Sequence, residues 1–242
     1  MSYKNIYEEW ISNPYFDETT KKELIAIAED ENEIKERFYA DLEFGTAGLR
    51  GIIGAGINRM NIYIVRRATQ GLANYILAQG GSEKGVAIAY DSRRMSPEFA
   101  DEAALCLAAN GIRAYRFESL RPTPELSFAV RELGCIAGIN VTASHNPPEY
   151  NGYKVYWEDG AQITAPHDSD IIGEVEKITD PSMVHFTGGD SNIKIIGKEV
   201  DEEYFKAILS LTQSPEMVKK HDHLKIVYTP LHGTGNTIAE KL

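Results

Sequence analysis

The amino-acid sequence predicts an α/β domain, because short apolar segments alternate with segments of helical periodicity along most of the 242 residues. Three apolar runs are the clearest strands: GVAIAYD (85–91), IRAYRF (112–117) and CIAGINVTAS (135–144). Each run leads into polar, glycine- or proline-containing residues, which end a strand. This alternation is typical of a sheet that is covered by helices.

The segments between these runs carry helix signals. Apolar side chains recur at helical spacing in residues 3–42, and Asn61 is a candidate N-cap for a helix that runs towards Leu77. Pro124 suits the first turn of a helix after the second strand. Further helices are expected at residues 96–110 and 168–178, and a fourth strand at YKVYW (153–157).

The C-terminal part has a different organisation. Residues 180–192 are rich in Gly, Asp, Ser and Pro and predict the edge of the first domain. An amphipathic helix (200–211), a buried-type strand (LKIVYTP, 224–230) and a helix start (233–242) follow. One strand and a short helix cannot bury their apolar faces alone, so we expect the start of a second domain, with association or disorder after about Lys198. The alternative is that residues 224–230 join the first sheet as an extra edge strand.

Composition narrows the class of protein. The net charge of -11 argues against nucleic-acid binding and against general affinity for anionic membranes. No apolar run approaches the roughly 20 residues that a membrane helix needs, and the N-terminus lacks a signal segment. Cys106 and Cys135 lie in apolar stretches, which predicts buried, reduced thiols and a cytoplasmic location.

The most informative segment is VTASHNPPEYNGYKVY, residues 141–156. It places Ser144 where an apolar strand meets a polar loop and returns Lys154 ten residues later, which would expose a hydroxyl beside a cation. A Ser-His dipeptide suggests a hydrolase, but neighbouring residues on an extended chain point to opposite sides, so His145 is not expected to act as a triad base. From the residues alone, Ser144 can also be an ordinary cap or turn residue.

Cations accumulate at the predicted strand ends. Arg50 lies between glycines in GTAGLRG, Arg93 and Arg94 follow a strand, and Arg121 opens RPTP. Each arginine alone can be a solvated surface charge, but several of them at strand ends of an acidic protein favour a site for a phosphorylated ligand.

Five segments in this order, GTAGLRG, YDSRR, TPELSFAV, TASHNPPEYNGYKVY and TPLHGTGN, resemble the α-D-phosphohexomutases, most closely their phosphoglucomutase/phosphopentomutase branch. The similarity runs from about Asp41 to the last residue. It implies a three-layer α/β/α domain with a mixed sheet, plus the start of a second similar domain. It also implies transfer of phosphate between O1 and O6 of a hexose phosphate through a phosphoserine and a bound hexose 1,6-bisphosphate.

The resemblance assigns roles to individual residues. Ser144 would be the phosphoserine, with a phosphoryl oxygen that also binds Mg²⁺. The other catalytic groups would be Arg50, His145 and Lys154. The implied substrate- and phosphate-binding residues are Thr46, Arg50, Arg93, Asn146 and Lys154.

The family's acidic D-G-D-x-D metal loop and its G-E-x-S-G sugar-reading loop do not occur in the sequence. Asp159-Gly160 is followed by alanine and glutamine and does not replace the metal loop. We therefore expect an N-terminal helical extension (1–40), the phosphoserine domain (41–198) and a truncated start of the second domain (199–242), whose partners are a sugar phosphate and the missing C-terminal domains. The alternatives are a non-catalytic module that binds phosphosugars or a partner, phosphomannomutase or phosphopentomutase specificity, and a serine hydrolase.

Overall fold

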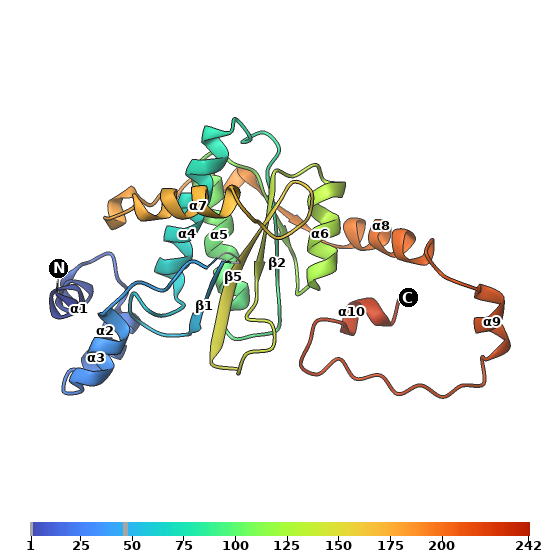
Figure 1. Cartoon of the computed structure of the whole chain (residues 1–242), viewed down its shortest axis with the longest axis horizontal. Helices are drawn as coiled ribbons and strands as arrows, with labels where there is room; N and C mark the ends of the chain where they lie inside the picture. The colour runs from blue at the N-terminus through green and yellow to red at the C-terminus, as the bar shows by residue number, and fades with distance from the viewer. Residues whose placement is uncertain (1, 46–47) are drawn as a thin grey trace.

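The computed structural model describes residues 2–45 and 48–242. Its centre is a six-stranded sheet with the strand order β1-β5-β4-β2-β3-β6 (Figure 1). The strands are β1 Leu49–Ile52, β2 Val86–Tyr90, β3 Ala114–Phe117, β4 Ala137–Val141, β5 Tyr150–Trp157 and β6 Ile193–Ile196. Strands β4, β2, β3 and β6 pair in parallel, whereas β5 runs antiparallel to both β4 and β1. The predicted α/β fold with a mixed sheet is confirmed.

Helices cover both faces of the sheet and make three layers. The helices α4 (Ile62–Ala78), α5 (Ser96–Ala109) and α7 (His167–Glu176) share one apolar core with the sheet. On the other face lie α6 (Thr123–Glu132) and α8 (Lys198–Leu209), as Figure 1 shows. The prediction of helices in all five segments is confirmed within a few residues.

Burial on both faces explains why the central strands are continuously apolar in sequence. Successive side chains of β2 enter opposite cores: Ile88 belongs to the α4–α5 side and Ala89 to the α6 side. Cys106 and Cys135 are both buried and free, as predicted, and burial raises the pKa of each thiol to about 12. Neither thiol is therefore ionised near neutral pH.

The predicted helical character of the N-terminal residues is confirmed, and they form three helices: α1 Tyr3–Ser12, α2 Glu18–Ala26 and α3 Glu31–Phe38. Asp17 and Asp30 cap the second and third helices by accepting backbone N–H bonds. Trp10 and Phe16 stack on each other against Tyr63 of α4.

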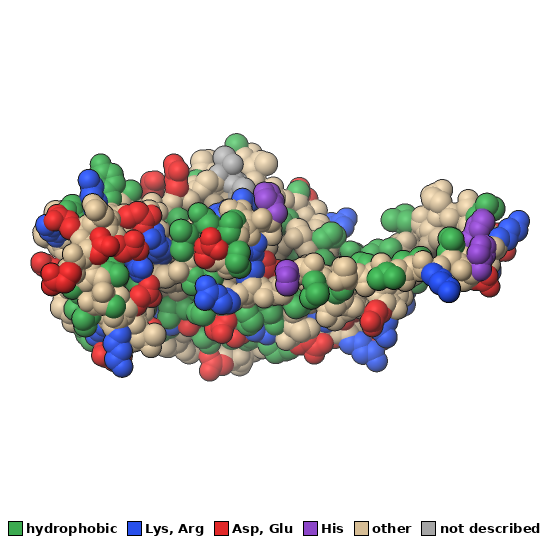
Figure 2. Space-filling view, turned by 90° about the horizontal axis from the view of Figure 1, so that it is seen from below, with side chains coloured by type: hydrophobic (Ala, Val, Ile, Leu, Met, Phe, Trp, Pro, Cys, Tyr) green, Lys and Arg blue, Asp and Glu red, His purple; other side chains and the backbone are tan. Residues whose placement is uncertain are grey.

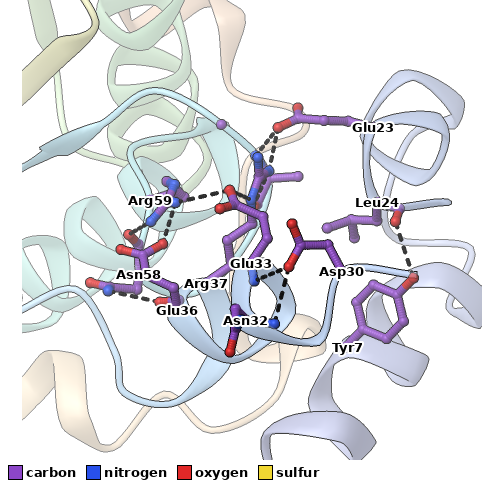
Figure 3. Close-up of polar contacts among 12 residues, drawn as sticks. Tyr7, Glu23, Leu24, Asp30, Asn32, Glu33, Glu36, Arg37, Asn58 and Arg59 are labelled. Carbon is purple, nitrogen blue, oxygen red and sulfur yellow. Dashed lines mark hydrogen bonds and ion pairs between the residues drawn. The ribbon is translucent and has the colours of Figure 1, made fainter. Parts of the chain in front are cut away.

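Ion pairs fasten the extension to the main domain (Figure 3). Arg37 pairs with Glu23 and Glu33 and also donates to the carbonyl of Ala55. Arg59, which is almost fully buried, pairs with Glu33 and Glu36. Aromatic packing and these ion pairs therefore join the extension to the loop before α4.

The chain beyond α8 departs from prediction. It contains the short helices α9 (Pro215–Lys220) and α10 (Asn236–Ala239). The strand expected at residues 224–230 is wrong: this segment pairs with no strand, neither in a second domain nor at the edge of the first sheet. Its side chains are exposed, with Ile226 at 84% and Val227 at 96%. Figure 2 shows the segment projecting from the main body with hydrophobic side chains on its surface.

The physical reason is the absence of a neighbour. A strand is stabilised by backbone pairing and by burial of one face, and residues 224–230 find neither among the described residues.

No helix in the described part of the chain is long and apolar enough to cross a membrane.

Candidate functional site

Ser144 occupies an unusual backbone conformation in the loop after β4. Its φ is 59°, in the left-handed region that few residues other than glycine adopt. The side-chain oxygen of Thr142 accepts a hydrogen bond from the Ser144 N–H at 3.0 Å, and the Ser144 side chain is exposed. Strained conformations of this kind are held by their surroundings and concentrate at functional sites.

Arg93 provides those surroundings. Its guanidinium donates to four loop carbonyls, those of Ser144 (3.0 Å), Asn146 (2.6 Å), Pro147 (2.8 Å) and Tyr150 (3.0 Å). The loop that carries Ser144 is therefore tied to one side chain from the end of β2.

Arg93 also has a carboxylate partner. Its remaining N–H, on Nε, faces Asp91 Oδ2 at 3.3 Å, and Asp91 Oδ1 also accepts from the Arg93 backbone N–H. The four N–H groups on Nη1 and Nη2 have carbonyl acceptors, and Nε has an ion-pair partner. Arg93 thus holds the loop in this structure, and its contact with a phosphate stays a prediction.

Arg50 reaches the same loop from β1. Its Nη1 donates to Asn146 Oδ1 at 3.0 Å, and the remainder of its guanidinium is exposed. Arg50 lies opposite Gly152 of β5, where a Cβ would meet the carbonyl oxygens of Thr142 at 2.6 Å and Leu49 at 2.8 Å. A glycine is therefore required for β1 to bring Arg50 this close to the loop after β4.

Lys154 follows on β5, opposite Asn140 of β4. Partial burial lowers the pKa of Lys154, and the positive charge of Arg50 lowers it further. Lys154 has no ion pair within the described ranges. A lysine with a lowered pKa is better suited to exchange protons near neutral pH than an ordinary surface lysine.

His145 corrects one expectation. Ser144 Oγ and His145 Nδ1 are 3.3 Å apart, although the sequence argument placed their side chains on opposite sides. That argument assumed an extended chain, and the left-handed conformation of Ser144 invalidates it. Of the residues that the structure describes, no carboxylate hydrogen-bonds His145, so a hydrolase triad is not formed.

A cleft of about 800 Å³ opens beside Ser144. One wall consists of strand-end residues, among them Ser92, Arg94 and Asn146, and the other of residues from the segment 230–236. Ser92 Oγ donates to the carbonyl of His232 at 2.9 Å, which links the two walls. The cleft lies at the carboxyl ends of β2 and β4, where open α/β sheets bind their ligands.

Of the other residues that the sequence singled out, Arg121 is described by the structure and Thr46 is not. Arg121 lines the cleft but is buried and paired with Asp201, so its charge is neutralised. Thr46 lies outside the described residues.

Sequence reasoning missed Asn151, which is fully buried and donates to Ser96 Oγ and to the carbonyl of Arg94. A polar residue beside glycine inside an apolar strand was the available signal.

The described residues offer no site for a metal ion. They contain no cluster of three or more His, Cys, Asp or Glu side chains placed to hold one. Apart from a phosphoryl oxygen on Ser144, the described part of the chain therefore does not fit the oxygen-rich coordination that Mg²⁺ requires.

The Ser144 hydroxyl is exposed beside Arg50 and Lys154, two cations without an ion pair among the described residues, at the edge of the sheet where the parallel strands end. This arrangement is typical of α/β/α domains that bind phosphorylated ligands. The family model described as "Phosphoglucomutase/phosphomannomutase, alpha/beta/alpha domain I" matches residues 41–182. The chain belongs to this family, the α-D-phosphohexomutases, and contains its domain I.

Relatives of known sequence agree with this assignment. The chain is 38% identical over 244 residues to a probable phosphoribomutase of Schizosaccharomyces pombe, with 96% of this chain and 40% of that protein covered. It is 41% identical over 207 residues to a phosphoglucomutase of Staphylococcus epidermidis, with 84% of this chain and 37% of that protein covered. The chain thus spans about two fifths of the length of these relatives.

Solved structures share the fold. A putative phosphomannomutase from Thermus thermophilus matches with a TM-score of 0.61 and 28% identity, over 72% of this chain and 37% of that one. A phosphoglucomutase from Paramecium matches with a TM-score of 0.62 over 84% of this chain and 41% of that one, and its 19% identity supports the fold alone.

Proposed function

We propose that this chain is the phosphoserine-bearing portion of a phosphoglucomutase-type enzyme and that Ser144 is the phosphoryl carrier. The observation that carries the proposal is the exposed Ser144 hydroxyl, which Arg93 holds in a left-handed loop beside Arg50, in a chain of this family. The division into residues 1–40, 41–198 and 199–242 is part of the proposal.

The proposed reaction has two transfers. A phosphorylated Ser144 gives its phosphoryl group to a free hydroxyl of a hexose phosphate. The P–O bond to Ser144 breaks, a P–O bond to the sugar oxygen forms, and the proton of the sugar hydroxyl passes through a nearby base to Ser144 Oγ. The resulting hexose 1,6-bisphosphate reorients and returns its other phosphoryl group to Ser144 Oγ. The net change moves phosphate between O1 and O6.

The side chains around Ser144 suit this chemistry. Arg50 supplies positive charge beside the transferring group, since phosphoryl transfer depends mainly on positioning and charge neutralisation. Lys154 is a candidate for proton exchange with the substrate because its pKa is lowered. His145 is a second candidate, since its Nδ1 lies within hydrogen-bond distance of Ser144 Oγ.

Mg²⁺ belongs to the proposal only as an expectation from the family. The described residues do not form a site for it, so no step is assigned to the metal. We also propose that sugar recognition and the remaining phosphate contacts depend on chain outside these 242 residues, since the relatives are more than twice as long.

Pentose phosphate is the second candidate substrate. The S. pombe relative, named a probable phosphoribomutase, matches 96% of this chain, whereas the S. epidermidis phosphoglucomutase matches 84%. Measuring mutase activity on glucose 1-phosphate and on ribose 1-phosphate, with a protein that contains this chain and the remaining domains, separates the two substrates.

The carrier role is tested by phosphate transfer to the protein. Incubation with glucose 1,6-bisphosphate labelled with ³²P, followed by peptide mass analysis, is expected to place one phosphate on Ser144, and Ser144→Ala is expected to remain unlabelled. Labelling that persists in Ser144→Ala would refute the role of this serine. Binding of glucose 1-phosphate without labelling or turnover would instead support a non-catalytic binding module.

A further inference from the structure

Three carboxylates surround one guanidinium at the carboxyl end of β3. Arg121 is only 3% exposed and donates to both oxygens of Asp201 on α8, at 2.7 and 2.9 Å. Glu118 and Glu125 also lie within ion-pair distance of Arg121, at 3.5 and 3.7 Å. The cluster therefore holds one positive charge for three acidic groups.

Glu125 differs from the other two acids. Its side chain is fully buried, and neither of its oxygens accepts a hydrogen bond. Glu118 is 58% exposed and is solvated, and Asp201 has the bidentate partner. A second buried negative charge without donors costs several kcal/mol, so Glu125 is the group that retains a proton.

The neighbours of Glu125 agree with this. Burial above all, and then the nearby Asp201 carboxylate, raise the pKa of Glu125 to about 8, although the charge of Arg121 opposes the shift. Burial alone would raise the pKa of Asp201, but the donors and charge of Arg121 outweigh it and lower that pKa, so Asp201 is the ionised member of the pair. Tyr204 of α8 also faces Glu125, whose charge adds to the effect of burial in raising the pKa of Tyr204.

The cluster lies between two helices that otherwise share mainly apolar contacts. Glu125 belongs to the first turn of α6, and Asp201 to the first turn of α8. The rings of Phe128 on α6 and Tyr204 on α8 pack at 5.5 Å. Figure 1 shows α8 beside α6 and the chain leaving the sheet from the end of α8.

We propose that a proton on Glu125 fastens α8 to α6 as a pH-sensitive latch, which loosens when that proton is lost. Because the pKa of Glu125 in the folded chain lies above its ordinary value of 4.5, the stabilisation is complete below pH 4.5, decreases as pH rises from there, and is lost once pH passes about 8. Arg121 lines the Ser144 cleft, and α8 leads to the segment 230–236 that forms its other wall. Loosening of α8 therefore also alters the cleft.

The test is hydrogen exchange of the 242-residue chain between pH 5 and 9.5, corrected for the intrinsic pH dependence of exchange. Protection of residues 198–209 is expected to fall by up to tenfold per pH unit between about pH 5 and pH 8, because Glu125 releases one proton on opening in this range, and to level off above about pH 8. Protection of α4, on the other face of the sheet, serves as the internal reference and is expected to stay constant.

Two variants separate the latch from general alkaline loosening. Glu125→Gln mimics the protonated acid and is expected to keep α8 protected up to pH 9.5. Glu118→Gln removes an exposed acid that pairs with the same arginine, and it is expected to keep the wild-type pH dependence. Equal pH dependence in wild type and Glu125→Gln overturns the proposal.

A measurement on the unmodified chain covers the case in which Glu125→Gln does not fold. Carbon-13 NMR of the Glu125 carboxyl is expected to show a titration midpoint near pH 8. A midpoint below pH 6 means that Glu125 is ionised at neutral pH and overturns the proposal. Neither readout depends on phosphoryl transfer by Ser144, so the latch and the proposed function fail separately.

Discussion

Replacing Arg93 by alanine tests whether this residue holds the Ser144 loop or contacts phosphate. The substitution removes the donors to four loop carbonyls. The carbonyls of Ser144 and Pro147 are at exposed positions, where water can replace the donor, whereas those of Asn146 and Tyr150 are partly buried. At about 1–2 kcal/mol for each acceptor left without a donor, the expected loss of stability is about 2–4 kcal/mol.

The assay is thermal and urea unfolding without ligand. For a chain of this length, the expected loss of stability lowers Tm by about 4–16 °C. Arg93→Lys is the informative companion, because lysine keeps the charge but lacks the planar fork that reaches several carbonyls at once. We expect Arg93→Lys to recover little of the lost stability.

Arg94→Ala is the matched control. Arg94 is the neighbouring exposed cation, and its side chain has no ion pair within the described chain, so its removal is expected to leave Tm unchanged. If Arg93→Lys is as stable as wild type, or Arg93→Ala loses phosphate affinity but no stability, the loop-holding role is refuted.

Three other predictions concern Lys154, Gly152 and Tyr63. Lys154→Met is expected to reduce phosphoryl transfer at least tenfold, which rate measurements check. The pKa of Lys154 in the folded chain is below its ordinary 10.5, so its charge opposes folding at neutral pH and stability rises slightly as pH rises. Lys154→Met is expected to remove this rise, which unfolding measured at several pH values checks. Gly152→Ala is expected to cost about 3 kcal/mol in urea unfolding, because its Cβ would meet two backbone oxygens at 2.6 and 2.8 Å, and a cost below about 0.5 kcal/mol would contradict the close packing of β1. Tyr63→Phe removes hydrogen bonds of 2.8 and 2.7 Å with Asp17 and is expected to lower the free energy of unfolding by about 1–2 kcal/mol. It is also expected to speed proteolysis within residues 1–40, and unchanged proteolysis would mean that this contact does not hold the N-terminal helices in place.

Sequence periodicity predicted the buried strands and the helices of the main domain, since both patterns reflect burial that is fixed by local spacing. It did not predict β1 or β6, which are edge strands of only four residues, too short for their pattern to stand out. Their position depends on backbone pairing with β5 and β3, far along the chain. The edge of the sheet therefore could not be located from local sequence.

The site shows the same division. The motif around Ser144 located the loop and the candidate nucleophile, and those residues lie together in the structure. The contacts of Arg93 and His145 could not be predicted, because they depend on the left-handed conformation of Ser144 and on the direction of the loop carbonyls. A sequence motif shows which residues are near one another but not which donors are already used.

The distribution of used donors decides where phosphate affinity resides. Arg93 pairs with Asp91 and Arg121 with Asp201, so these two strand-end arginines add almost no net positive charge to the cleft. Arg50, Arg94 and Lys154 have no ion pair within the described residues. Because an anion gains most from cations that are not already neutralised, the phosphate affinity of this chain is expected to depend on these last three residues, and the two paired arginines contribute instead to the shape of the site.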